Sequence, residues 1–197
     1  MATRSFIGVV VNPQDKGISI KPNLEVLGKE INIGVSLDEL VFHDIEIDSN
    51  TELIGIYHHN DGDPNYLGKT LLNEFGTYEK VLNLIAFGDA SSIIGQKADF
   101  YTSWIKSYIE RDYQFDPRQY ESIQKFEDIH NESLDSIVFL YLFKDGEWYI
   151  KFKYHKYGNT DWQAKTDSVC QYSDFRFKQA RELKCLADFV YETMVLN

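Results

Sequence analysis

The stretch from 137 to 155 constrains the fold of this chain more than any other. Residues 137–143 and 147–155 are rich in β-branched and aromatic residues, and they flank Lys144-Asp145-Gly146. Asp-Gly between two such runs is a strong signal for a tight β-hairpin. The second run alternates two sets of side chains, Trp148, Ile150, Phe152 and Tyr154 with Tyr149, Lys151, Lys153 and His155. Because successive side chains of a strand point to opposite faces, we expect one core face and one cationic, aromatic face.

Apolar periodicity elsewhere predicts further strands and several amphipathic helices. Residues 5–11 and 52–58 are short β-branched runs, which are typical of buried strands. Apolar spacing and end signals predict helices at 66–75, 78–87, 116–129 and 174–195. Thr77 is a suitable N-cap for the second helix, and Asp116-Pro117 is a suitable start for the third.

The region between the first two strands has a different character. Its short apolar runs are broken by Pro22, Gly28 and Gly34, which predicts several short strands. The chain shows no repeat, low-complexity tract or obvious linker. We therefore expect residues 1–197 to form a single α+β domain with a mainly antiparallel sheet, a β-rich arm over about 13–51, and amphipathic helices that include a C-terminal helix.

The charge balance narrows the class of partner. The 197 residues carry 20 Lys and Arg against 31 Asp and Glu, a net charge of −11, and 15% are aromatic. The aromatic content is typical of a folded domain, and the acidity argues against binding duplex nucleic acid through its phosphates. Every apolar run is shorter than the roughly 20 residues of a membrane span. With only Cys170 and Cys185 and no signal-peptide pattern, we expect a cytoplasmic protein.

The acidity is concentrated in one segment. Residues 38–63 contain eight Asp and Glu and no Lys or Arg. Within 43–48, acids alternate with Ile, which predicts a strand with one solvated acidic face. Such a face is either ordinary solvated surface or a surface complementary to a basic partner, such as the nucleic-acid channel of an enzyme. The candidate partner-binding residues are Asp38, Glu39, Asp44, Glu46, Asp48 and Glu52.

A second candidate site follows the strand at 52–58. His58 and His59 point to opposite faces of a strand, so we expect no shared metal ion, and the residues after them also fit an ordinary turn. Tyr57, His59 and Asp61 alternate and are able to share one face. Gly68-Lys69-Thr70 lacks the glycine spacing of a phosphate-binding loop, and neither cysteine has an activating neighbour. The alternative ligand-binding set is Tyr57, His59, Asp61, Lys151, Lys153 and His155, and we assign no catalytic residue, metal or cofactor.

Two stretches in the first half form a recognisable signature. The chain begins Ala2-Thr3-Arg4-Ser5-x-Ile7-Gly8 and continues with Ile56-Tyr57-x-His59-x-Asp61-Gly62-x-Pro64-x-x-x-Gly68-x-x-Leu71-Leu72. Together these resemble a family of small uncharacterised proteins of phage and prophage genomes, and Ala86-x-Gly88-Asp89-x-Ser91-Ser92 is similar to the next segment of those proteins. Residues 13–51 have the place of an insertion in this resemblance. The family signature carries no known chemistry, so no catalytic residue is transferred.

These patterns lead to two hypotheses. The resemblance implies a phage accessory protein, and small acidic proteins of that kind are, by analogy, often inhibitors of host defence. The leading hypothesis is a non-enzymatic phage protein in the host cytoplasm that binds a basic surface of a host defence or nucleic-acid enzyme, as anti-CRISPR or anti-restriction proteins do. The alternative is a small-ligand or nucleotide-binding protein, a hydrolase among the options, that uses the region of Tyr57, His59 and Asp61. The oligomeric state is left open.

Overall fold

The computed structural model describes residues 4–31, 44–93, 95, 97–100, 116–132, 137–152 and 184–186. The strands in these ranges are β1 (Arg4–Val10), β2 (Ser19–Ile20), β3 (Glu30–Ile31), β4 (Ile45–Glu46), β5 (Leu53–His58), β6 (Ala90–Ser92), β7 (Lys97–Phe100), β8 (Arg118–Tyr120), β9 (Ile137–Lys144), β10 (Glu147–Phe152) and β11 (Lys184–Cys185). The helices are the 3-10 turn η1 (Pro13–Asp15), α1 (Leu24–Leu27), the π-helix η3 (Pro64–Gly68), α2 (Lys69–Glu74), α3 (Tyr78–Ala86) and α5 (Ile123–Glu132).

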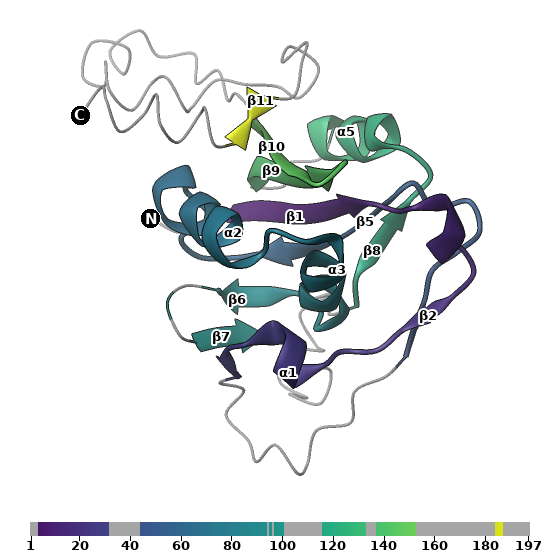
Figure 1. The fold of residues 1–197 in the computed structure, drawn as a ribbon. Helices are drawn as coiled ribbons and strands as arrows, with labels where there is room; N and C mark the ends of the chain where they lie inside the picture. The colour runs from purple at the N-terminus through teal and green to yellow at the C-terminus, as the bar shows by residue number, and fades with distance from the viewer. Residues whose placement is uncertain are drawn as a thin grey trace, which may run out of the picture.

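The fold is α+β and is built on a mixed sheet. Among the described residues, this sheet has nine strands in the order β11-β10-β9-β1-β5-β6-β7-β3, with β8 also paired to β5 (Figure 1). β1 is antiparallel to β5 but parallel to β9, and the β5–β6 and β3–β7 pairs are parallel as well. The expectation of a mainly antiparallel sheet is therefore met only in part, because long connections allow parallel pairing that local hairpin signals do not reveal.

Helices cover both faces of this sheet, and each face has its own core (Figure 1). On one face, α2 and α3 pack on alternate residues of the central strands; this cluster includes Ile7, Val9, Ile54, Ile56, Leu71, Leu84, Phe139 and Tyr141. On the other face, α5 packs through Phe126 on a smaller cluster that includes Phe6, Leu53, Leu140 and Leu142. The strands at the centre are thus buried on both sides, which explains why β1 and β9 are apolar at nearly every position.

The hairpin predicted around Asp145-Gly146 is confirmed. β9 and β10 pair antiparallel, with Lys144 opposite Glu147. The two turn residues have positive φ angles of 52° for Asp145 and 85° for Gly146. Positive φ at both central positions matches the twist of the flanking strands, which is why Asp-Gly is favoured there.

The structure agrees with the expected bounds of one helix and revises another. α3 spans Tyr78–Ala86, and the side chain of Thr77 accepts a hydrogen bond from the backbone of Lys80, as predicted for its N-cap. The helix expected at 66–75 begins earlier, because Pro64–Gly68 forms a π-helical turn before α2. Asp63 caps this turn by accepting from the backbone N–H of Asn65 at 2.8 Å.

Two helix predictions are wrong in part. The segment expected to be a helix from 116 begins instead as strand β8, which pairs with Leu53–Gly55, and α5 starts only at Ile123. The open edge of β5 overrides the local Asp-Pro cap signal there. In the expected C-terminal helix 174–195, Lys184–Cys185 pair with Tyr149–Ile150 as strand β11. The remainder of that prediction lies outside the described residues, apart from Leu186, which is buried.

The arm predicted at about 13–51 is only partly β-structured where the structure describes it. β2 and β4 form a separate two-stranded ladder, whereas β3 joins the main sheet beside β7. The turn α1 is capped by Asn23 and ended by Gly28 in a left-handed conformation. No helix within the described ranges is long and apolar enough to cross a membrane. That residues 1–197 form one domain stays a prediction.

Candidate functional site

The acidic strand predicted at 43–48 is a strand only at Ile45–Glu46 (β4), but the described residues 44–48 keep the expected alternation. Asp44, Glu46 and Asp48 are exposed, while Ile47 between them is fully buried. Burial of one set of side chains directs the other set into solvent, as a period of two requires. The segment therefore presents a row of carboxylates to the surroundings.

Glu52 continues this row just before β5 and is half-buried. We call Asp44, Glu46, Asp48 and Glu52 the acidic edge. Within the described ranges, no ion pair involves any of these four side chains. Two further predicted contact residues, Asp38 and Glu39, lie outside the described residues.

The backbone of the acidic edge is anchored to β8 by one side chain. The amide oxygen of Gln119 accepts hydrogen bonds from the backbone nitrogen of Asp48 at 2.9 Å and from the hydroxyl of Thr51 at 2.8 Å. Its amide nitrogen donates to the backbone carbonyl of Glu46 at 2.8 Å. Gln119 thus makes hydrogen bonds of the kind that a neighbouring strand would make to this turn.

Glu121 is a neighbour of the acidic edge that the sequence did not single out. It is exposed, and its carboxylate accepts from the side-chain amide of Asn50 at 3.2 Å. Because β8 was expected to be helical, nothing in the linear pattern indicated that residues near 120 lie beside residues near 50. The pairing of β8 with β5 brings them together.

Tyr57 and His59 of the alternative ligand site are in contact. The Tyr57 hydroxyl lies 3.1 Å from Nδ1 of His59, and their rings are 5.9 Å apart in an edge arrangement. Both side chains lie on the same face of β5, which is the face on which α5 packs near Leu53. Partial burial, and then the charge of Arg4, lower the pKa of His59. The structure therefore supports the predicted Tyr57–His59 pairing and adds a cation beside it.

Arg118 also reaches this pair, and a glycine makes room for it. Its guanidinium lies 6.0 Å from the centre of the Tyr57 ring. Arg118 is opposite Gly55 in the β5–β8 ladder. Because Gly55 has no side chain, none lies at that position between Arg118 and Tyr57. A Cβ at Gly55 would come within 2.4 Å of the Phe6 ring, which means that close packing of Phe6 across the sheet requires glycine there.

Asp89 holds Arg118 in place and joins two strands. Its carboxylate accepts two hydrogen bonds from the guanidinium, at 2.8 and 2.9 Å, and one from the backbone nitrogen of Tyr57 at 2.8 Å. β8 pairs with β5 at Leu53–Gly55 and β6 pairs at His58, so the Tyr57 amide falls between them. Burial raises the pKa of Asp89 to about 7, while Arg118 and the Tyr57 amide act in the opposite direction.

Lys151 of the alternative site is not brought to Tyr57. Across the sheet, Lys151 is opposite Leu140, Leu140 is opposite Phe6, and Phe6 is opposite Tyr57. Strands β1 and β9 therefore lie between Tyr57 and Lys151, which places the two residues about 14 Å apart at the usual strand spacing. The register therefore separates the two halves of the expected site.

α5 covers the hairpin face that was expected to be cationic and open. Lys151 forms an ion pair with Glu127 of α5, and the exposed fractions of their side chains are 12% and 5%. Lys151 is thus a core cation with its own carboxylate. Lys153 and His155 lie outside the described residues.

Asp61, the third residue of the predicted Tyr57–His59–Asp61 set, lies in the turn that follows β5. It is exposed and has a positive φ of 58°. The next residue, Gly62, accepts a hydrogen bond from the buried Tyr141 hydroxyl at 2.8 Å. Asp61 is therefore carried on an anchored turn, which agrees with the turn interpretation of this motif.

His58 faces the opposite core from His59, as the alternation predicts. It is fully buried, and its Nδ1 lies 3.4 Å from the hydroxyl of Ser5. Burial, and then the neighbouring His59, lower the pKa of His58 from 6.5 to about 3. His58 is therefore a neutral core residue at physiological pH.

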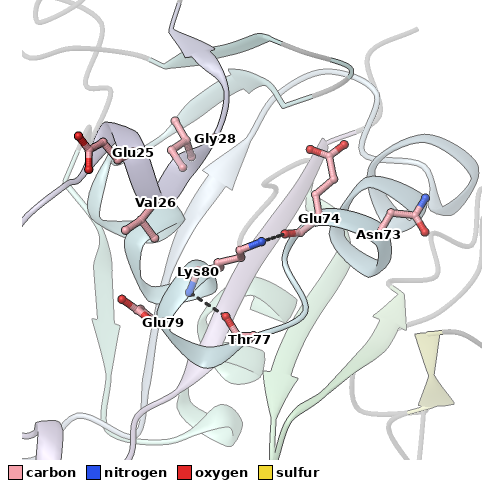
Figure 2. Close-up of a pocket in the computed structure, with 9 residues that line it drawn as sticks. Glu25, Val26, Gly28, Asn73, Glu74, Thr77, Glu79 and Lys80 are labelled. Atoms are coloured by element: carbon pink, nitrogen blue, oxygen red, sulfur yellow. Dashed lines mark hydrogen bonds between the residues drawn. The ribbon is translucent and has the colours of Figure 1, made fainter.

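A groove lies between α1 and the turn that joins α2 to α3. Figure 2 shows Lys80 directed at the backbone carbonyl of Glu74, to which its amine donates at 3.4 Å. The lining also includes the carboxylates of Glu25 and Glu79. In the part of the chain that the structure describes, no three His, Cys, Asp or Glu side chains are placed to share a metal ion.

Comparisons with protein-family models, with curated proteins and with solved structures find no match for this chain.

Proposed function

We propose that this protein is a non-enzymatic binding protein that docks its acidic edge on a basic surface of a partner. The partner class that fits is a host defence or nucleic-acid enzyme, whose phosphate-binding channel is basic, and the protein acts as its inhibitor in the host cytoplasm. The phage-type signature at the start of the chain supports the same assignment.

The observation that carries this proposal is a row of carboxylates without internal ion pairs, in the described ranges, on an anchored backbone. Asp44, Glu46 and Asp48 are exposed, whereas carboxylates such as Glu127 and Asp89 are paired with cations. Complementary charge steers association and selects the partner. An ordered row also loses less conformational freedom on binding than a mobile one.

The alternative ligand site receives less support in its predicted form. It required Lys151 beside Tyr57 and His59, but Lys151 is paired with Glu127, and two strands lie between Lys151 and Tyr57. The acidic edge, in contrast, depends on residues that are already contiguous. The binding protein is therefore the function that the geometry supports best.

Charge reversal tests the proposal directly. The protein is screened for inhibition of DNA cleavage against a panel of purified host restriction and CRISPR nucleases, and association rates are measured at several salt concentrations. For an inhibited nuclease, the triple variant D44K/E46K/D48K is expected to associate at least about tenfold more slowly at low salt. Association of the parent protein is expected to slow as salt rises, because salt screens exposed charges.

A matched variant separates this local effect from net charge. Glu30, Glu79 and Glu147 are also exposed, and E30K/E79K/E147K changes the net charge by the same amount. This control is expected to associate at nearly the parent rate. Equal slowing by both variants, or inhibition that is insensitive to both, refutes the assignment of the acidic edge as the interface.

A further inference from the structure

A small cationic cluster lies at the other end of β5 from the acidic edge. It consists of Arg4, Tyr57, His59 and Arg118, and we call it the basic corner. Three strands supply it: β1, β8, and β5 with the residue that follows it. The cluster is independent of the proposed function, since it involves none of the acidic-edge residues.

The strand register places Arg4 beside His59. Ser5 is opposite His58 and Phe6 is opposite Tyr57 in the antiparallel β1–β5 ladder. Continuing that register by one position sets Arg4 opposite His59, on the same face as Phe6 and Tyr57. Directly opposite residues of an antiparallel pair have Cβ atoms about 5 Å apart. The lowering of the His59 pKa by the charge of Arg4 is consistent with this closeness.

The contact with Tyr57 prepares His59 to donate a hydrogen bond. When the Tyr57 hydroxyl donates to Nδ1 of His59, across 3.1 Å, the ring proton of a neutral imidazole resides on Nε2. Among the described residues, Nε2 of His59 has no hydrogen-bond partner, and the ring is half-buried. A donor held next to an arginine is suited to an anion.

The basic corner includes two arginines of a strongly acidic chain, and the charge of one of them, Arg118, is paired with Asp89. Arg118 is held by its bidentate pair with Asp89, lies over the Tyr57 ring and closes one side of the cluster. Arg4 is the second cation, on the side of His59. Guanidinium and imidazole N–H groups are donors that phosphate oxygens favour.

We propose that the basic corner binds the phosphate group of a small ligand. Arg4 provides the positive charge, and His59 donates a hydrogen bond through Nε2. Tyr57 orients the His59 ring, and the Asp89–Arg118 pair fixes the position of Tyr57. Tyr57 and Asp89 are thus positioning residues, while Arg4 and His59 contact the phosphate.

Titration of the full chain tests this site. Inorganic phosphate, a nucleoside 5′-monophosphate and the corresponding nucleoside are added separately, at constant ionic strength with chloride as the balancing anion. The ring nitrogens of His59 are followed by NMR. We expect saturable shifts with inorganic phosphate and with the monophosphate at a dissociation constant of about 1 mM or below. A monophosphate that binds at least about tenfold more tightly than phosphate indicates a nucleotide, and equal binding indicates the phosphate group alone.

Variants identify the contact residues. By calorimetry, R4Q and H59Q are each expected to weaken phosphate binding at least about tenfold, as loss of a charge-assisted contact predicts. Lys97 is exposed and lies on β7, which β6 separates from β5, so K97Q is expected to bind like the parent. If R4Q does not fold, H59Q decides. The proposal is overturned by unshifted His59 resonances, by shifts with the nucleoside alone, or by variants that bind as tightly as the parent.

Discussion

Replacing His58 with glutamine should change how the stability of this protein depends on pH. His58 is fully buried, and its pKa is lowered from 6.5 to about 3 in the folded chain. Below pH 6.5 the unfolded chain therefore binds a proton at His58 that the folded chain does not. Acid therefore favours the unfolded state, and the contribution of His58 to the free energy of unfolding falls as pH decreases below 6.5.

The size of the effect follows from proton linkage. Each pH unit below the unfolded pKa removes about 1.4 kcal/mol, so His58 should lower the free energy of unfolding by about 2 kcal/mol between pH 6.5 and pH 5. Asp89 acts in the opposite sense, because its pKa is raised from 3.8 to about 7 and the folded chain holds the extra proton. In the parent protein these two contributions oppose each other over this range.

Urea unfolding from pH 7.5 to pH 5, followed by the fluorescence of the buried Trp148, measures the effect. Relative to the parent, H58Q should gain about 2 kcal/mol of stability as pH falls from 6.5 to 5, whatever its offset at neutral pH. H59Q is the matched control, since His59 is only partly buried and its pKa is lowered in the same direction. Its difference from the parent should change in that direction and by less. A constant difference between H58Q and the parent across this range would refute a buried, neutral His58.

Three further predictions concern stability and order. E127Q leaves the Lys151 cation without its carboxylate, and should cost about 3 kcal/mol in urea unfolding at pH 7; a loss below about 1 kcal/mol contradicts a buried pair. G55A places a Cβ 2.4 Å from neighbouring atoms, whereas G146A meets no atom within 4 Å, so thermal unfolding should show a loss of about 3 kcal/mol for the first and about 1 kcal/mol for the second. Q119A removes two hydrogen bonds to the acidic edge and one to Thr51. Hydrogen exchange at the Asp48 amide should become faster than in the parent, while exchange in β1 stays the same; unchanged exchange at Asp48 shows that Gln119 does not order this turn.

Several elements were predictable because their signals are local. The Asp145-Gly146 turn specifies a hairpin through its backbone conformation, and Thr77 specifies the start of α3 through one side-chain hydrogen bond. The alternation around Ile47 likewise depends only on neighbours in sequence. Such features need no knowledge of what lies across the fold.

Other predictions failed in part where a distant partner overrode a local preference. Asp116-Pro117 is a suitable helix start, but the residues after it pair with the open edge of β5. The two-residue strand at Lys184–Cys185 likewise exists because β10 has an edge to pair with. In both cases backbone hydrogen bonds across the sheet outweighed a helical pattern.

The candidate sites divide in the same way. Most of the acidic edge was predictable from the sequence, because Asp44, Glu46 and Asp48 alternate with Ile45, which is partly buried, and Ile47, which is fully buried. The basic corner was not, since Arg4 and Arg118 reach Tyr57 and His59 only through the pairing of β1 and β8 with β5. Tyr57 and His59 alone were visible in the sequence.

By itself the sequence determined an acidic α+β chain with one unambiguous hairpin and a located row of carboxylates. These properties depend on composition, side-chain alternation and turn chemistry, which act over a few residues. Only the tertiary structure decided that Lys151 is neutralised by Glu127 in the core, and that β1 lies between β5 and β9 with helices on both faces. Register and burial decide which charges remain exposed, because a cation meets its carboxylate across strands and helices that are distant in sequence.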